Sequence, residues 1–224
     1  GLVLHLDRRA HRAGAGLDAM AQDLEAMLAV TLPLAEACDS AGRLIVAPDP
    51  FHAAELEPAA VRCARPFPRV SVAALFREHL GLEIARLHEG DALRRRALAA
   101  DLPGADALPG DFEQVFFALW NRFEHRLGRE APLLVVDWPA PLASLARLKP
   151  GDPSVAERME WIIAGMELAN GFAELTDAAE QRRRFELDRA LRRERGLPAL
   201  PLDEKFLRAL GEGMPPAAGM ALGA

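Results

Sequence analysis

The chain has 224 residues, half of them hydrophobic, and a formal net charge of −6 at pH 7. This composition predicts one folded, soluble domain, and the acidic balance argues against broad nucleic-acid binding through phosphate contacts. No apolar run reaches the length of a membrane span, no secretory leader pattern opens the chain, and its two cysteines lack a metal-ligand spacing, so we expect a cytoplasmic protein with reduced thiols.

The sequence of the first half of the chain predicts helices and strands that pack in the core rather than residues of a functional site. Arg94, Arg95 and Arg96 are read as a solvated helix face, with a phosphate or tRNA contact as the alternative. The periodicity and the capping residues predict these elements: a strand at 2–6, a helix from Leu17 to Thr31, a strand Leu44–Val46, a surface connection from Pro48 to Pro68, a helix from Ser71 to Gly81, and a helix at 91–100.

The second half predicts a longer run of regular elements around one hairpin. Gly219 and Gly223 bracket apolar residues, which is typical of a strand passing close to a ligand, although a glycine-loosened tail is the alternative. The other expected elements are a helix capped by Asp111 that runs to Leu127 and stops at Gly128, a buried strand Leu133–Val136 that delivers Asp137, a helix from Ala178 to Arg195 capped by Asp177, and a helix from Asp203 through Leu210.

The hairpin predicted between Met159 and Asp177 carries the chemistry. Its sequence, MEWIIAGMELANGFAELTD, is apolar enough to be buried, yet it holds Glu160, Glu167 and Glu174. A buried carboxylate is costly unless it meets a metal, a cation or several hydrogen-bond donors. The segment therefore predicts the floor of a site for a cationic substrate and a metal-bound nucleotide.

The spacing also predicts how the hairpin pairs. With Ala164 and Gly165 as a two-residue turn, Ile163 pairs with Met166, Ile162 with Glu167, and Glu160 with Ala169. Glu160 and Glu167 then share one face, where two carboxylates would repel unless a divalent cation lay between them.

Strict alternation turns Asn170 and Glu174 to the opposite face, so we expect a bulge or kink near Gly171 that brings them round. The competing interpretation of the whole segment is an amphipathic edge hairpin whose glutamates are solvated. Spacing alone does not choose between the two.

The stretch ERMEWIIAGMELANGFAELTDAAEQRRRF resembles the class II lysyl-tRNA synthetases and their shorter paralogues, the elongation factor P lysine ligases. VVDWPAPLASLARL before the hairpin and RGLPALPLDEKFLRALGEGMPPAAGMALG after it resemble the same family. The wording ELANGFAELTD and GMPPAAGMALG is closer to the ligases. The resemblance is strongest over residues 111–223 and looser back to Arg12.

The resemblance implies an α+β fold, the class II synthetase catalytic core, with an antiparallel sheet flanked by helices. It implies ATP- and Mg²⁺-dependent activation of lysine or (R)-β-lysine to an adenylate, followed by transfer to a lysine of elongation factor P. By position, the implied roles are metal binding for Glu160 and Glu167, ATP binding for Glu167, Leu168 and Gly223, and substrate binding for Asn170 and Glu174, with no side chain assigned to catalysis.

The chain also departs from the family pattern. The phrase of the second family motif falls by position on Leu4–Arg12, where Arg12 matches, Arg9 replaces an acidic position and His11 replaces an aromatic one. The arginine after the glycine strand is not reached. We therefore expect residues 1–224 to be a partial catalytic domain without an anticodon-binding domain, from a homodimer that binds neither tRNA nor membrane. The alternatives are an inactive synthetase-like binding module and a lysyl-tRNA synthetase fragment.

Overall fold

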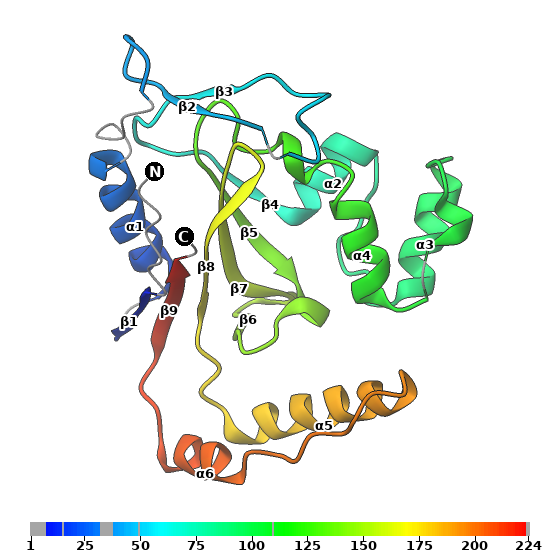
Figure 1. Cartoon of the computed structure of the whole chain (residues 1–224). Coiled ribbons are helices and arrows are strands. Elements are labelled where there is room, and N and C mark those ends of the chain that lie inside the picture. The colour runs from blue at the N-terminus through cyan, green and yellow to red at the C-terminus, as the bar shows by residue number, and fades with distance from the viewer. Residues whose placement is uncertain (1–7, 15, 32–37, 49, 109, 223–224) are drawn as a thin grey trace.

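A mixed sheet with helices on both faces forms the centre of the molecule (Figure 1). The structure, a computed structural model, describes residues 8–14, 16–31, 38–48, 50–108 and 110–222. Within these ranges the sheet has seven strands in the order β1-β9-β8-β7-β5-β4, and β6 pairs with β7. Every pair is antiparallel except β4 with β5. The predicted α+β class with an antiparallel sheet flanked by helices is confirmed.

The strands come largely from the second half of the chain. The main sheet contains β1 (Arg8–Ala13), β4 (Arg69–Ser71), β5 (Leu133–Pro139), β6 (Leu148–Lys149), β7 (Asp152–Ile163), β8 (Met166–Ala173) and β9 (Ala217–Leu222), and a separate two-stranded sheet contains β2 (Leu44–Val46) and β3 (Ala59–Val61).

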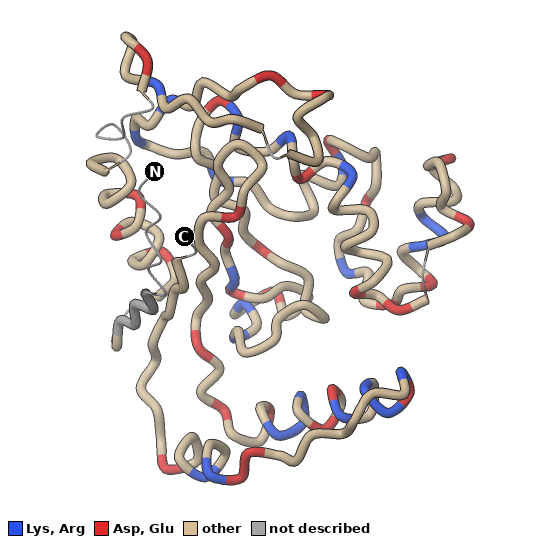
Figure 2. The backbone as a smooth tube through the Cα atoms, in the orientation of Figure 1, with Lys and Arg blue, Asp and Glu red and all other residues tan. Residues whose placement is uncertain are grey.

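The helices lie on both faces and at one end of the sheet (Figure 1). Lys and Arg alternate with Asp and Glu along α5, which marks a solvated helix (Figure 2). The helices are α1 (Leu17–Thr31), α2 (Val72–Leu80), α3 (Gly90–Ala99), α4 (Phe112–Trp120), α5 (Ala178–Glu194) and α6 (Glu204–Glu212), with short 3₁₀ turns η2 (Ala105–Ala107), η3 (Glu124–Arg126) and η4 (Ala140–Leu142).

One face of the sheet packs against α1. The helix presents an apolar stripe, and every second side chain of the strands points toward it. Trp161 of β7 lies at the centre of this layer, with the Phe67 ring edge-on at 5.5 Å. The buried residues of this cluster are Met20, Ala21, Leu24, Leu28, Phe67, Leu134, Met159, Trp161, Ala169, Ala218 and Met220.

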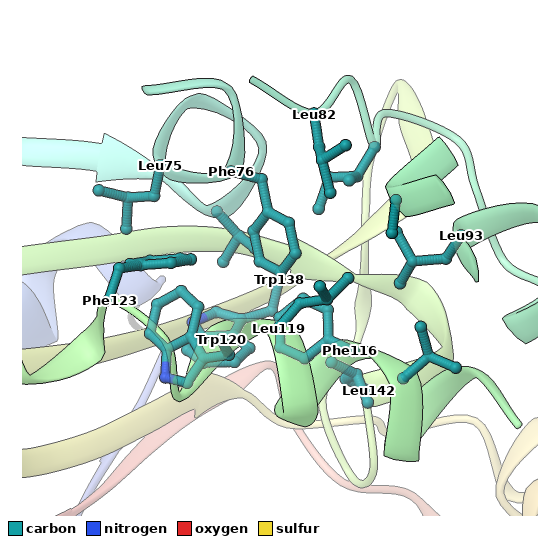
Figure 3. Packing of buried hydrophobic residues seen from close by; sticks show 14 of the residues in the cluster. Leu75, Phe76, Leu82, Leu93, Phe116, Leu119, Trp120, Phe123, Trp138 and Leu142 are labelled. Atoms are coloured by element: carbon teal, nitrogen blue, oxygen red, sulfur yellow. The ribbon is translucent and has the colours of Figure 1, made fainter. Parts of the chain in front are cut away.

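The other face packs against α2 and α4 at the β4–β5 edge, around a group of aromatic rings (Figure 3). Phe116 and Trp120 of α4 stack with ring centroids 5.9 Å apart, and Trp138 of β5 lies 5.2 Å from Trp120. Such pairs stabilise a core beyond their buried area. This aromatic cluster covers one end of the sheet face and leaves the β8–β9 end for a pocket.

Two expectations about helices and loops are wrong in part. The helix predicted to run from 112 to 127 ends at Trp120, because Phe123 leaves helical geometry with φ −134° and inserts its ring against Phe76 and Trp120. The segment Pro48–Pro68 is more than a surface connection, since it contains β3 and buries alternate small side chains, Val61 and Cys63 among them.

Candidate active site

The turn of the hairpin follows the prediction. Ala164 and Gly165 have φ of 51° and 82°, the positive values that a tight two-residue turn requires. Ile163 pairs with Met166, and Ile162 with Glu167, as predicted. A side chain at position 165 would collide with the backbone of His125, so glycine is needed there for space as well as for conformation.

Beyond the turn the predicted register is wrong, because β8 contains one extra residue. Leu168 has no partner in β7, so Trp161 pairs with Ala169 and Glu160 pairs with Asn170 rather than with Ala169. Leu168 packs against two apolar clusters, one under α1 and one beside β3, which accounts for a bulge at this residue. The kink predicted near Gly171 is also wrong, because Gly171 pairs regularly with Met159 and Met220.

The bulge decides which face carries the polar side chains. One extra residue reverses the alternation, so Asn170 lies directly across from Glu160 on the same face, and Phe172 and Glu174 follow on that face. Glu167, opposite Ile162, is on this face too, but it is exposed. The structure thus brings Glu160, Asn170 and Glu174 to one surface of the sheet.

Gly171 lets β8 and β9 approach closely. A Cβ atom at this position would lie 3.0 Å from the Gly219 carbonyl oxygen and 3.2 Å from the Met220 Cε atom. A side chain here would point toward Met159 and Met220 in the layer under α1, so the glycine provides space on the face opposite the pocket.

Glu160 is almost fully buried and is held by two donors. Arg158 Nη2 donates to Glu160 Oε1 at 2.6 Å, and Asn170 Nδ2 donates to the same oxygen at 3.2 Å. Only 3% of Glu160 is exposed to solvent, which makes these bonds its principal compensation for lost hydration. Neither bond was predicted from the sequence.

Burial is the main reason that the pKa of Glu160 is raised, to about 8. The guanidinium of Arg158 opposes this shift, whereas the negative charges of Glu167 and Glu124 add to it. Burial also raises the pKa of Glu124, with a further contribution from Glu167. Three carboxylates thus influence one another here, and an added cation would stabilise their ionised forms.

A pocket of about 1140 Å³ opens over this floor. Asn170 and Phe172 line it from β8 and Glu174 from the residue that follows β8, while Arg158 lines it from β7 and Gln181 from α5. Asn170 Oδ1 is buried and has no hydrogen-bond partner among the described residues, and the same holds for Gln181 Nε2. Buried polar atoms of this kind are usually satisfied by a ligand or by water.

The far wall of the pocket is α5, which is fixed to the sheet layer. Asp177 caps this helix by accepting from the backbone N–H groups of Ala179 and Glu180. Arg184 Nη1 donates to the carbonyl oxygens of Ser144 and Ala146, at 2.9 and 2.7 Å. These bonds set the helix beside Glu174, whose own backbone N–H donates to the carbonyl oxygen of Ala217, the first residue of β9.

The structure unites part of the predicted site. Gly223 lies outside the described residues, as do the side chains of Arg9, His11 and Arg12. Leu168 lies at the bulge with its side chain in apolar clusters. Sequence reasoning missed Arg158, although its position two residues before Glu160 on one strand already placed it on the same face.

Comparison with known proteins identifies the family. The model of the class II tRNA synthetases (D, K and N) matches residues 20–224. The chain belongs to this family.

Several similar curated proteins carry the name elongation factor P–(R)-β-lysine ligase. The protein of Haemophilus influenzae (strain PittGG) is 40% identical over 162 residues, covering 70% of this chain and 48% of that protein. The protein of Edwardsiella ictaluri is 54% identical over 100 residues, covering 45% and 31%. The protein of Erwinia tasmaniensis is 41% identical over 167 residues, covering 73% and 50%. This class II synthetase chain spans about half the length of most of these relatives.

The donor set fits a nucleotide-bound magnesium ion better than a self-contained metal centre. Among the described residues no group of three His, Cys, Asp or Glu side chains could hold a metal ion. Magnesium bound with ATP usually takes one or two protein carboxylates and completes its shell with phosphate and water. Glu160 and Glu167, whose negative charges influence each other, are the carboxylates that would supply that share.

The described part of the chain contains no helix with the length and apolar character needed to span a membrane.

Proposed function

We propose that this chain carries the amino-acid and ATP site of an elongation factor P lysine ligase. It would activate lysine or (R)-β-lysine with ATP to an adenylate and transfer the aminoacyl group to a lysine of elongation factor P. The names of the relatives support the substrate and the acceptor, and the class II synthetase family supports the use of ATP.

The observation that carries the proposal is the polar floor on β8. Asn170 offers a buried carbonyl oxygen without a partner, and Glu174 adds a carboxylate on the same face of the same pocket. Both groups accept hydrogen bonds, and a charge-assisted bond from an ammonium group is among the stronger ones in proteins. A ligand that carries amino groups is therefore the chemistry that this floor suits.

Glu160 and Glu167 are the residues we propose for Mg²⁺, and Glu167, Leu168 and Gly223 for the nucleotide. When bound, Mg²⁺ neutralises phosphate charge and aligns the in-line attack at the phosphate that carries adenylate formation. The chain's own part is to bind and orient: β8 holds the amino acid, and β9 keeps close to β8 through Gly171.

The homodimer, the cytoplasmic location and the absence of tRNA binding stay predictions. The two alternative functions, an inactive binding module and a lysyl-tRNA synthetase fragment, make different predictions about the acceptor and the adenylate, so one set of assays separates all three.

The first assay is amino-acid-dependent ATP–pyrophosphate exchange on the purified chain, with Mg²⁺ and either lysine or (R)-β-lysine. Exchange shows adenylate formation, and its absence with intact amino-acid binding favours the binding module. The second assay offers the activated amino acid to elongation factor P or to lysine tRNA. Transfer to the protein alone supports the proposal, and transfer to tRNA alone would refute it.

A further inference from the structure

The side chain of Arg158 is held on three sides. Its guanidinium carbon lies 4.6 Å from the centroid of the Trp138 ring, its Nη1 donates to the Leu142 carbonyl oxygen at 3.0 Å, and its Nη2 donates to Glu160 at 2.6 Å. Stacking and two directed donors leave a planar guanidinium one orientation. Arg158 therefore fixes the position of the Glu160 oxygen that also accepts from Asn170.

Glu160 in turn fixes the amide of Asn170. Arg158 only donates hydrogen bonds, so it holds Glu160 Oε1 as an acceptor, and Asn170 must present its NH₂ group to that oxygen, as the 3.2 Å bond shows. Rotating the amide by half a turn would bring two acceptor oxygens together. The carbonyl oxygen of Asn170 is thereby turned away from Glu160, and it is buried without a partner among the described residues.

We propose that Arg158 is a positioning residue that acts through Glu160 and Asn170 and makes the pocket select a cationic amino group of the substrate. The proposal rests on the proposed function, since it specifies how that site reads its amino acid. A buried acceptor without a partner is costly, and an ammonium group, which only donates, removes that cost. A carbonyl or carboxylate at the same place would be repelled.

Ligand discrimination tests the chain of contacts. Arg158→Met keeps an unbranched apolar stem and removes the charge and the donors of the guanidinium. The probes are lysine, norleucine, which lacks the side-chain amino group, and 6-aminohexanoate, which lacks the α-amino group, each titrated calorimetrically. We expect lysine affinity to fall about tenfold while affinity for one of the two analogues changes less than about twofold, because that analogue lacks the selected group. An equal loss for all three ligands, or no loss, would overturn the proposal.

The matched control is Arg147→Met. Arg147 forms an ion pair with Glu157, which lies on β7 beside Arg158, and the two charged groups are 2.5 Å apart. Arg147 itself is not part of the pocket lining. Its variant should keep the wild-type preference among the three ligands. Arg158→Lys, which restores the charge without the planar fork, should recover part of the discrimination.

A measurement without substrate separates this proposal from the proposed function. In the intact wild-type chain the side-chain NH₂ of Asn170 should give two well-resolved ¹⁵N-correlated proton signals, identified by their loss in Asn170→Asp. In Arg158→Met they should move toward each other and exchange faster, with the backbone spectrum unchanged. Unchanged signals would overturn the positioning role. If wild-type protein binds no lysine, the proposed function fails and the selectivity claim fails with it, while the amide signals still decide whether Arg158 fixes Asn170.

Discussion

Glu174 is the residue on which recognition of the substrate amino group depends most in our proposal. Replacing it by Gln keeps its size and removes its charge, so lysine should lose the charge-assisted bond. We expect binding to weaken about 10- to 100-fold, equivalent to 1.5–3 kcal/mol for hydrogen bonds to charged groups. Calorimetric titration of lysine measures this, and the unfolding midpoint of Glu174→Gln should stay close to wild type.

The control for this variant is Glu186→Gln, an exposed position on α5 that should bind lysine as wild type does. Lysine affinity unchanged in Glu174→Gln would remove Glu174 from the site.

Glu160 predicts a dependence of stability on pH. Its pKa lies near 8 in the folded chain against an ordinary 4.5, so between these values the folded state binds a proton that the unfolded state has lost. The stability of the ligand-free chain should therefore fall as pH rises through this window, by at most about 1.4 kcal/mol per pH unit from this group. Urea unfolding at pH 5 and pH 8 measures it, and Glu160→Gln should reduce the loss.

Parallel curves for wild type and Glu160→Gln would show that Glu160 does not titrate in this window. The strongly shifted Glu180 does not interfere, because Arg183 and Arg184 lower its pKa to about 2 and so move its contribution below pH 4.5.

At the scale of single elements, the sequence predicted features that depend on neighbouring residues and missed features that depend on tertiary packing. Ser71, Asp111 and Asp177 cap their helices as predicted, because a cap needs only neighbouring backbone N–H groups. The bulge at Leu168 depends on apolar partners far away in sequence, so spacing within the hairpin could not reveal it. The partnership of Arg158 with Trp138 and Leu142 was hidden for the same reason.

The connection between η3 and β5 depends on Gly128. Its φ is 65°, and a side chain there would collide with the backbone of Ile162 on β7. Gly128→Ala should therefore cost about 3 kcal/mol or more of unfolding free energy, since strain and collision add. Denaturant unfolding checks this value.

The comparison is Gly151→Ala. Gly151 also has a positive φ, of 85°, but open space surrounds its Cα. Gly151→Ala isolates the effect of conformational strain, which we expect to lower the unfolding free energy by about 1 kcal/mol. Equal losses in the two variants would show that the contact with β7 does not matter.

At the scale of the whole molecule, the two apolar layers share one sheet. Leu134 faces α1, whereas the next residue, Val135, faces the aromatic cluster. Because both layers use the same strands, unfolding of the strands would disrupt the layer under α1 and the aromatic layer together. The order of the strands, and the pairing of β1 with β9 from opposite ends of the chain, were beyond local sequence signals. The family resemblance supplied the architecture that periodicity alone did not.

This sharing predicts a single unfolding transition. Trp161 reports on the α1 layer, and Trp120 and Trp138 report on the other; these are the three tryptophans of the chain. Leu24→Ala, made under α1, should cost about 2–5 kcal/mol and shift both reporters equally. Fluorescence of Trp161→Phe and of the double variant Trp120→Phe/Trp138→Phe measures the two layers separately. Two distinct midpoints would show that the layers unfold independently.

The bulge at Leu168 is what lets a strand of this length present the site. If Leu168 paired regularly with Trp161, every later residue of β8 would change face, and Asn170, Phe172 and Glu174 would turn toward α1. Deleting Leu168 would instead leave a regular hairpin in which Ala169 still pairs with Trp161 and Asn170 with Glu160, so the three side chains would keep the pocket face. A relative with one residue fewer between the turn and Asn170 should thus keep the amino-acid site on an unbulged strand, whereas a chain of this length keeps it only through the bulge.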